Sequence, residues 1–249
     1  MIELSGVVIT FNEEKKIGRC LDSLLKVCED VVVVDSFSTD RTKEICLEKG
    51  ARFIENKFEG HIEQKNFAIT QAKYSYVLSL DADEELDDEL IESIKWIKKH
   101  FSKDGYAMKR RNNYCGKWIR FGSWYPDIKL RLWESMMGKW VGENPHDRFE
   151  LKEEGTQAML DGHILHYTID TVEDHKKQVE KFSDIAAREL KKKGKRLPGL
   201  FIVVRSSFKF ITDYFFRFGF LDGKYGFIIA RLNARYVYLK YTKAKKANP

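Results

Sequence analysis

The stretch Tyr76–Asp83, with the sequence YVLSLDAD, decides the fold, because an apolar run ends there in two carboxylates two residues apart. An apolar run of this length predicts a strand buried on both faces in a parallel sheet. Side chains at positions i and i+2 of an extended chain point the same way, so we expect Asp81 and Asp83 to face one crevice at the carboxyl edge of the sheet. Two carboxylates there suit Mg²⁺ or Mn²⁺, which completes its ligand shell with phosphate and water oxygens.

A second interpretation of the same acids needs no metal. Residues 83–88 are rich in Asp and Glu and precede a helical pattern from about Asp87 to His100. Acidic side chains stabilise the N-terminus of a helix through the helix dipole. The stretch by itself leaves both interpretations open.

The chain before this stretch alternates apolar strands with helical patterns. Strands are predicted at 4–11, 31–35 and 52–54, and helices follow each of them, with apolar spacing from Ile17 to Leu25, then through about Lys49, and from His61 to Ala72. The polar residues Asn12–Glu14 are expected to cap the first helix. This alternation predicts an α/β fold with a mostly parallel, doubly wound sheet.

Polar side chains end three of the predicted strands. Thr10 and Asn12 lie at the end of the first strand, Asp35 ends the second, and Asp81 and Asp83 lie at the end of the strand at 76–80. The ends of parallel strands lie on one edge, so these residues are expected to line a single crevice. Neither a Gly-x-Gly-x-x-Gly nor a Gly-x₄-Gly-Lys loop follows any strand. A diphosphate held without such a loop needs a metal, which favours the metal interpretation over a dinucleotide-dependent dehydrogenase or a P-loop enzyme.

Residues 105–170 have a different composition, rich in aromatic residues, arginine and glycine. Strand-like pieces occur at 106–110, 129–133, 157–160 and 164–167. Four of the five tryptophans, all but Trp96, fall in this region, which also contains Tyr125. Aromatic rings stack on the C–H faces of sugars, but they also fill protein cores, and the sequence leaves both roles open.

Three motifs of the first hundred residues resemble those of a known enzyme family. The stretches Val7–Glu14 (VVITFNEE), Val31–Asp35 followed by Ser-x-Ser-x-Asp, and Leu80–Glu84 (LDADE) resemble the nucleotide-site motifs of glycosyltransferase family two, inverting enzymes with the GT-A fold. Further on, WYPD at 124–127, KLRLW at 129–133 and NPHD at 144–147 resemble the branch that includes lipopolysaccharide core β-1,4-glucosyltransferases. The resemblance covers residues 1 to about 170 with the motifs in order.

The resemblance implies a nucleotide-diphosphate sugar donor, commonly a UDP-sugar, and a divalent metal, Mg²⁺ or Mn²⁺. It implies that Asp83 binds this metal and the diphosphate, that Asp81 lies near the ribose and that Asp35 contacts the base. A solvated helix turn is the alternative for the residues at 64–66. The donor-site residues implied in this way are Thr10, Asn12, Glu13, Asp35, Gln64, Lys65, Asp81 and Asp83.

The same resemblance implies acceptor contacts and a catalytic base. An inverting transfer needs one carboxylate to remove the proton of the acceptor hydroxyl, and no protein nucleophile. Asp147 is the first candidate base and Asp127 the second, while His146-Asp147 departs from the His-Glu pair more common in this branch. Trp124, Tyr125, Arg131 and His146 are the expected acceptor contacts.

The C-terminal part of the chain is strongly basic. The chain has a net charge of +6, but residues 188–249 hold 16 Lys/Arg and three Asp/Glu, so the rest is acidic. A charged helix is predicted from Glu173 to Lys193, followed by apolar and basic stretches at 200–218 and 225–241. No run of about eighteen residues lacks charge, so no membrane-spanning helix is expected. The tail is expected either to bind an anionic membrane surface or to pack on the catalytic domain with a basic outer face.

These observations predict a GT-A domain over residues 1–170, with a nucleotide-sugar half at 1–100 and an acceptor half at 101–170, and a helical extension at 171–249. Four scattered cysteines and no export segment indicate a cytoplasmic protein. Because of its basic tail, we expect this protein to bind peripherally to the inner face of the membrane. The Gln-x-x-Arg-Trp motif of processive synthases is missing, which favours addition of single sugars. Two alternative functions are considered. The first is a nucleotidyltransferase, but the glycine/arginine-rich loop usual in such enzymes is missing. The second is a non-enzymatic protein that binds nucleic acid through the basic tail, but the acidic remainder of the chain would repel a polyanion.

Overall fold

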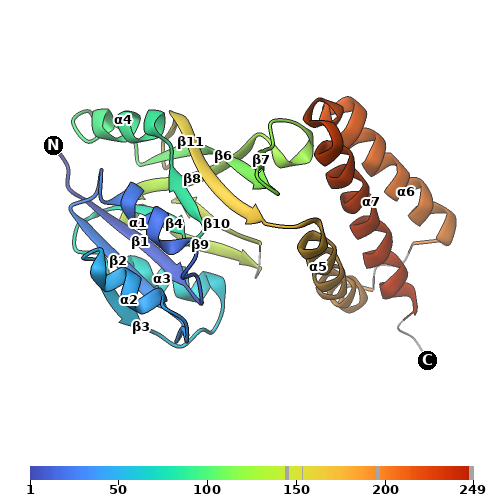
Figure 1. Cartoon of the computed structure of the whole chain (residues 1–249), viewed down its shortest axis with the longest axis horizontal. Helices are drawn as coiled ribbons and strands as arrows, with labels where there is room; N and C mark the ends of the chain where they lie inside the picture. The colour runs from blue at the N-terminus through green and yellow to red at the C-terminus, as the bar shows by residue number, and fades with distance from the viewer. Residues whose placement is uncertain (144–145, 153, 195–196, 247–249) are drawn as a thin grey trace. The chain divides into compact units, whose positions relative to one another are not determined.

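The structure is a computed structural model that describes residues 1–143, 146–152, 154–194 and 197–246, without the side chains of Glu143, His146 and Lys246. The chain forms two compact units (Figure 1). The sheet unit consists of Met1–Arg110 and Asp127–Tyr167, and the helical unit consists of residues 111–126 and the chain from Thr168 onward. The sequence placed a boundary near residue 170, and the structure adds residues 111–126 to the helical part.

The sheet unit begins with the predicted alternation of strands and helices and continues with strands. Its elements are β1 (Leu4–Thr10), α1 (Ile17–Leu24), β2 (Asp30–Asp35), α2 (Thr42–Glu48), β3 (Arg52–Glu55), α3 (His61–Thr70), β4 (Tyr76–Asp81), β5 (Glu84–Leu86), α4 (Asp88–Ile97), β6 (Gly105–Tyr114), β8 (Asp127–Glu134), β9 (Gly138–Glu143), β10 (His146–Leu151) and β11 (Gln157–Ile169). Strands β6 and β11 continue into the helical unit at their C-terminal ends.

The main sheet has the strand order β3-β2-β1-β4-β8-β6-β11-β5. Its first four strands are parallel, and β8 pairs antiparallel with both β4 and β6. Thr10 pairs in register with Asp35, and Ile9 pairs with Asp81. The predicted parallel, doubly wound sheet is therefore confirmed for the first half of the unit, and its polar strand ends lie side by side.

Alternate residues of the buried strands face two hydrophobic layers. One layer packs against α1, α2 and α4, and the other packs against α3 and the β9–β10 hairpin (Figure 1). The sheet residues of the first layer include Val8, Val33, Leu78 and Leu80, and those of the second include Val7, Val32, Val34 and Val77. Apolar side chains on both faces explain why these strands read as uninterrupted apolar runs.

Two local predictions need correction, and several strands were not predicted. Asn12–Glu14 do not cap α1, which begins at Ile17 without a side-chain cap bond. Asn12 instead has a left-handed φ of 53° and uses its side chain to join two loops. The strands predicted at 157–160 and 164–167 are one strand, β11, and β5, β9 and β10 were not predicted.

The helical unit contains α5 (Val172–Lys192), α6 (Gly199–Ile211), a π-helical turn at Thr212–Phe216, a 3-10 turn at Gly219–Asp222 and α7 (Gly223–Lys246). It also contains the short strand β7 (Lys117–Trp118) and the 3-10 turn Gly122–Trp124. Helix α7 packs against both α5 and α6. A small core of Tyr114, Ile119, Ile169 and Ile229 holds the helices to the end of β6. Over the described residues, no helix is long and apolar enough to cross a membrane.

Two buried carboxylates tie the loop at residues 117–126 to the helices. The Asp222 carboxylate accepts hydrogen bonds from the backbone N–H groups of Arg120 and Phe121. The Asp213 carboxylate accepts hydrogen bonds from Ser123 Oγ at 3.0 Å and from Asn233 Nδ2 at 2.9 Å. Asp213 also pairs with Lys209 at 2.9 Å, and because both acids are buried and bonded inside the unit, neither adds negative charge to its surface.

Candidate active site

The carboxyl ends of β1, β2 and β4 bring the first predicted site residues together. Thr10 and Asp35 are buried next to each other, and Thr10 Oγ1 has no hydrogen-bond partner among the described residues. The Asp35 carboxylate accepts hydrogen bonds from the backbone N–H and the hydroxyl of Ser38. A buried hydroxyl without a partner beside a fixed carboxylate is a polar position at which a bound ligand can supply the missing hydrogen bond.

The loops that follow β1 and β2 are joined by hydrogen bonds. The backbone N–H of Asn12 donates to Ser38 Oγ at 2.7 Å, and the backbone N–H of Thr39 donates to Asn12 Oδ1 at 2.8 Å. The backbone N–H of Glu13 donates to Thr42 Oγ1 at 2.9 Å. Asn12, Glu13 and Asp35 therefore belong to one preformed surface at the edge of the sheet.

Lys65 on α3 joins two predicted site carboxylates that are distant in sequence. Its Nζ lies 2.8 Å from Asp81 Oδ1 and 2.7 Å from Asp147 Oδ2, and 4.3 Å from the centre of the Trp140 ring. The Lys65 side chain is only 6% exposed. The structure thus places the candidate base Asp147 beside the carboxylate that ends β4.

Gln64, the neighbour of Lys65, is also buried and hydrogen-bonded. Its amide accepts a hydrogen bond from Asn56 and donates one to Ser36 Oγ at 3.2 Å. The alternative of a solvated helix turn at these positions is wrong, because both side chains are buried and bonded.

Arg131 holds Asp81 from the other side. The Arg131 guanidinium, which is 2% exposed, lies 3.0 Å from Asp81 Oδ2 and 2.9 Å from Glu84 Oε1. Burial alone would raise the pKa of Asp81, but the charges of Lys65 and Arg131 outweigh it and hold this pKa well below its usual value. Asp81 is therefore ionised, and both of its oxygens are engaged by cations.

Arg110 extends the network to the second candidate base, Asp127. Its guanidinium contacts Glu84 Oε1 at 2.8 Å and Asp127 Oδ2 at 2.7 Å, and Lys129 lies 3.1 Å from the other Asp127 oxygen. Burial opposes ionisation of Asp127, but attraction to Arg110 and Lys129 outweighs it and lowers the pKa of this carboxyl. A carboxylate held by two cations is a weaker base.

Asp83 differs from Asp81 in its neighbours. Its Oδ2 lies 3.3 Å from His166 Nε2 on β11, and its side chain keeps 23% of its exposure. A carboxylate oxygen and an imidazole nitrogen are suitable ligands for Mn²⁺, and Mg²⁺ also binds through one carboxylate with phosphate oxygens. The residues present fit a divalent cation at Asp83, with His166 as a ligand that the sequence analysis did not select.

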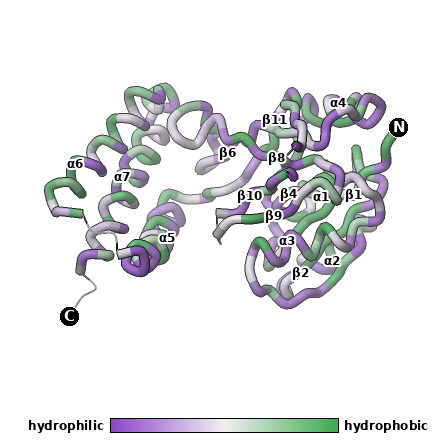
Figure 2. Tube along the Cα trace, turned by 180° about the vertical axis from the view of Figure 1, so that it is seen from behind, coloured by the Kyte–Doolittle hydropathy of each residue, from purple (hydrophilic) through white to green (hydrophobic). Residues whose placement is uncertain are grey.

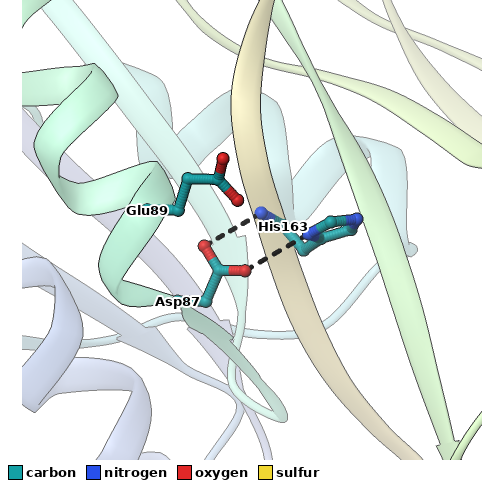
Figure 3. Close-up of side chains that lie close together, drawn as sticks. All are labelled: Asp87, Glu89 and His163. Atoms are coloured by element: carbon teal, nitrogen blue, oxygen red, sulfur yellow. Dashed lines mark hydrogen bonds and ion pairs between the residues drawn. The ribbon is translucent and has the colours of Figure 1, made fainter.

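A second cluster of potential metal ligands, Asp87, Glu89 and His163, has a structural explanation (Figure 3). Asp87 caps α4, because its Oδ1 accepts hydrogen bonds from the backbone N–H groups of Leu90 and His163. Its Oδ2 lies 3.3 Å from His163 Nδ1, while Glu89 is exposed. The cluster therefore fastens α4 to β11, and the oxygens of Asp87 are occupied by protein donors.

The predicted aromatic and acceptor residues lie in different surroundings. Trp133 and Trp140 are buried against Phe149 and belong to the core. Trp124 packs against Tyr114 and His175 in the helical unit, and the Tyr125 ring lies 5.9 Å from the Arg111 guanidinium. The prediction for His146 falls on a side chain outside the described part of the structure.

Comparison with known proteins identifies the family. The family model described as Glycosyl transferase family 2 matches residues 5–149, which is more than half of the chain. The chain belongs to this family. The sheet unit accordingly has the GT-A fold, and the protein is a glycosyltransferase. Family membership decides against a nucleotidyltransferase and against a non-enzymatic nucleic-acid-binding protein.

Several relatives match nearly the whole chain. An uncharacterized glycosyltransferase of Rickettsia typhi is 28% identical over 99% of this chain and 88% of its own length. The lipopolysaccharide core biosynthesis glycosyltransferase LpsC of Rhizobium meliloti is 27% identical over 100% of this chain and 96% of its own length.

Solved structures were also matched. A crystal structure of residues 1–349 of S. aureus TarS in complex with UDP is 20% identical over 98% of this chain and 90% of that chain, with a TM-score of 0.46. A longer TarS structure is 19% identical over 76% of this chain, which spans 40% of that chain, with a TM-score of 0.47.

Proposed function

We propose that this glycosyltransferase moves single sugars from a UDP-hexose to a saccharide or glycolipid of the cell envelope, such as lipopolysaccharide core, with inversion at the anomeric carbon. The observation that carries the proposal is the strand edge at which Thr10, Asp35 and Asp81 meet, next to Asp83 and His166. The envelope acceptor is supported by the similarity to LpsC along the whole chain.

The donor nucleotide is assigned to the edge of the parallel strands. Asp35, held by Ser38, is positioned to accept a hydrogen bond from the base, and Thr10 offers its unpartnered hydroxyl. Asn12 and Glu13 shape the adjoining surface, with Gln64 supporting the β2 loop through Ser36. Asp81, fixed between two cations, is assigned to the ribose.

The metal is assigned to Asp83, with His166 beside it, and Mn²⁺ or Mg²⁺ bound there would stabilise the charge of the leaving diphosphate. Asp83 suits this role better than Asp81, because the Asp81 oxygens are already engaged by Lys65 and Arg131. Asp83 has no Lys or Arg partner among the ion pairs of the described residues.

The catalytic base is assigned to Asp147. It would take the proton of the acceptor hydroxyl while that oxygen attacks the anomeric carbon from the face opposite the diphosphate. Lys65 holds Asp147 beside Asp81 through its contacts with both carboxylates. Asp127 is the second candidate, but two cations lower its pKa.

Acceptor contacts are proposed for Trp124 and Tyr125, which lie on the loop that Asp213 and Asp222 fix, and for His146. Arg131 was expected to contact the acceptor, but it is almost completely buried against Asp81, so we assign it to the positioning of Asp81 instead.

We also propose that the enzyme works at the cytoplasmic face of the membrane, where a lipid-linked acceptor is confined. Residues 188–249 carry 16 Lys/Arg against three Asp/Glu, which favours an anionic membrane surface as the partner. Nucleic acid is not the expected partner, because the rest of the chain carries a net negative charge.

The test is a panel of nucleoside diphosphates and nucleotide sugars, measured by thermal shift with and without Mn²⁺. UDP or a UDP-hexose should stabilise the wild type in a Mn²⁺-dependent way. Asp83→Asn should lose the Mn²⁺-dependent part and the transferase activity, whereas Asp88→Asn, a control at a fully exposed side chain, should keep both. Near wild-type turnover of Asp83→Asn would disprove the metal assignment, and stabilisation by another nucleotide alone would disprove the donor.

A further inference from the structure

Helix α6 and the turns that follow it expose most of their large apolar residues and bury the polar residues Ser206, Asp213 and Asp222. Leu200, Phe201, Phe208 and Phe216 are 62–74% exposed. The face of α6 turned toward the unit is instead formed by Ile202 and Ser206, followed by Asp213 in the next turn. A helix that only packs on a domain would bury its phenylalanines and expose its serine and aspartate.

The exposed apolar residues form one stripe along the helix. They recur at the three- and four-residue spacing of one helical face, and Figure 2 shows hydrophobic residues along the α6 segment. Further exposed apolar residues lie in the turns at 212–222 that follow the helix. We call this surface the α6 face, and its exposed apolar members are Leu200, Phe201, Val203, Val204, Phe208, Ile211, Phe215, Phe216, Phe218, Phe220 and Leu221.

The charges around the α6 face have a single sign. Residues 199–231 contain five cationic side chains and two acids. Both acids, Asp213 and Asp222, are buried and hydrogen-bonded within the helical unit, so they contribute no exposed negative charge. Arg205 and Arg217 are exposed next to the phenylalanines. The face therefore combines large apolar side chains with a rim of positive charge.

We propose that the α6 face is the surface by which the protein binds an anionic lipid bilayer, with its phenylalanines at the headgroup boundary and its arginines on lipid phosphates. Large apolar side chains beside Lys and Arg are the composition of interfacial helices. A second copy of this chain is disfavoured as the occupant, because a two-fold symmetric contact would bring the cationic rims of both copies together. The proposal makes the general membrane association proposed above specific to one surface.

The inference also separates two basic regions of the tail. The lysine run at 191–193 lies at the end of α5, whose exposed surface contains no comparable apolar stripe. If charge alone determined membrane binding, these lysines would contribute as much to the affinity as the arginines of the α6 face. If the α6 face inserts into the headgroup region, the cations next to the phenylalanines contribute more to the affinity than these lysines.

The test is sedimentation of the full-length protein with vesicles of 70% phosphatidylcholine and 30% phosphatidylglycerol, and with vesicles of phosphatidylcholine alone. The wild type should bind the anionic vesicles and be released by high salt. Phe208→Ser/Phe216→Ser should bind at least tenfold more weakly, with unchanged circular dichroism and melting temperature because both side chains are exposed. Trp96→Ser, which removes an exposed aromatic residue of α4, should bind like the wild type.

A second pair of variants tests the charges. Arg205→Glu/Arg217→Glu should weaken binding to anionic vesicles by more than tenfold, since each cation near such a surface contributes about fivefold. Lys191→Glu/Lys193→Glu, with the same change in net charge, should weaken it less. Equal effects of the two pairs, or wild-type binding by the phenylalanine variant, would overturn the proposal.

A concentration-dependent dimer that the phenylalanine variant abolishes, without lipid binding by the wild type, would assign the face to a second copy instead. Vesicle binding is measured without sugar transfer, so this inference and the proposed donor chemistry can fail separately.

Discussion

Replacement of Lys65 with methionine tests the central electrostatic contact of the active site. Methionine keeps most of the side-chain length and volume but removes the charge that Asp81 and Asp147 share at 2.8 and 2.7 Å. Asp81 keeps its contact with Arg131, whereas Lys65 is the one ion-pair partner shown for Asp147 among the described residues. The substitution should therefore leave Asp147 as a partly buried carboxylate without a neutralising charge.

Removal of one partner of a buried ion pair costs about 3–5 kcal/mol, and the lower end applies here because Arg131 still neutralises Asp81. A loss of about 3 kcal/mol corresponds to a fall in melting temperature of about 6–12 °C for a chain of this size. Lys95→Met is the matched control, since Lys95 pairs with Glu92 where both side chains are about half exposed or more. That surface pair should contribute less than about 1 kcal/mol.

The pH dependence separates loss of charge from loss of packing. Lys65 and Arg131 overcome the burial of Asp81 and hold its folded-state pKa below the unfolded value of about 3.9. A depressed carboxyl pKa adds stability that is present above the unfolded pKa and is lost as the pH falls through the folded one. The loss in free energy of unfolding caused by Lys65→Met should therefore be largest at neutral pH and should become smaller below about pH 4.

Urea unfolding of the wild type and both variants, from neutral pH down to about pH 3, measures this difference. A penalty for Lys65→Met that stays the same at every pH would mean that the lost packing, and not the charge, is responsible. A penalty no larger than that of Lys95→Met would refute the network itself.

Two further variants test the proposed base and the buried acid. Asp147→Asn should lower kcat by about 10²–10⁴-fold with nucleotide affinity nearly unchanged, as measured by steady-state kinetics and nucleotide titration. If Asp147→Asn is active and Asp127→Asn is inactive, the catalytic base is Asp127 instead. Glu84→Gln should lower the free energy of unfolding by about 3–5 kcal/mol, because it removes the buried carboxylate between the guanidinium groups of Arg110 and Arg131. A loss below about 1 kcal/mol in urea unfolding would show that Arg110 and Arg131 do not depend on this acid.

The parallel half of the fold could be predicted from sequence because its physics is local. Strands β1, β2 and β4 are buried on both faces, so the sequence of each is an apolar run. Each run ends where the chain reaches the polar edge of the sheet. The position of Asp35 and Asp81 at that edge follows from the ends of those runs. The remaining strands were harder to find, because their pairing depends on partners far along the chain.

Glu84 shows why part of the site was missed. It lies in a run of acids that resembles the start of a helix, and Asp87 does cap α4. Glu84 is nevertheless fully buried in β5, since Arg110 and Arg131 reach it from strands 26 and 47 residues away. No local pattern distinguishes this acid from its exposed neighbours, and the same holds for His166 beside Asp83.

The tail shows a similar limit. Its excess of positive charge and its phenylalanines could be read from composition, but the orientation of the residues could not. The burial of Asp213 and Asp222 depends on hydrogen bonds to the loop at 117–126, about a hundred residues earlier. Those bonds leave the α6 face without exposed negative charge, which is what makes a particular lipid-binding surface identifiable.

The charges of the site assign different tasks to its carboxylates. The network on the described residues contains four acids, Asp81, Glu84, Asp127 and Asp147, and four cations, Lys65, Arg110, Lys129 and Arg131. Such a balanced set fixes its members in place and leaves little negative charge to attract a metal ion. Asp83 pairs with His166 instead. Its charge is therefore available to a cation, and its replacement should affect metal-dependent nucleotide binding far more than it affects folding.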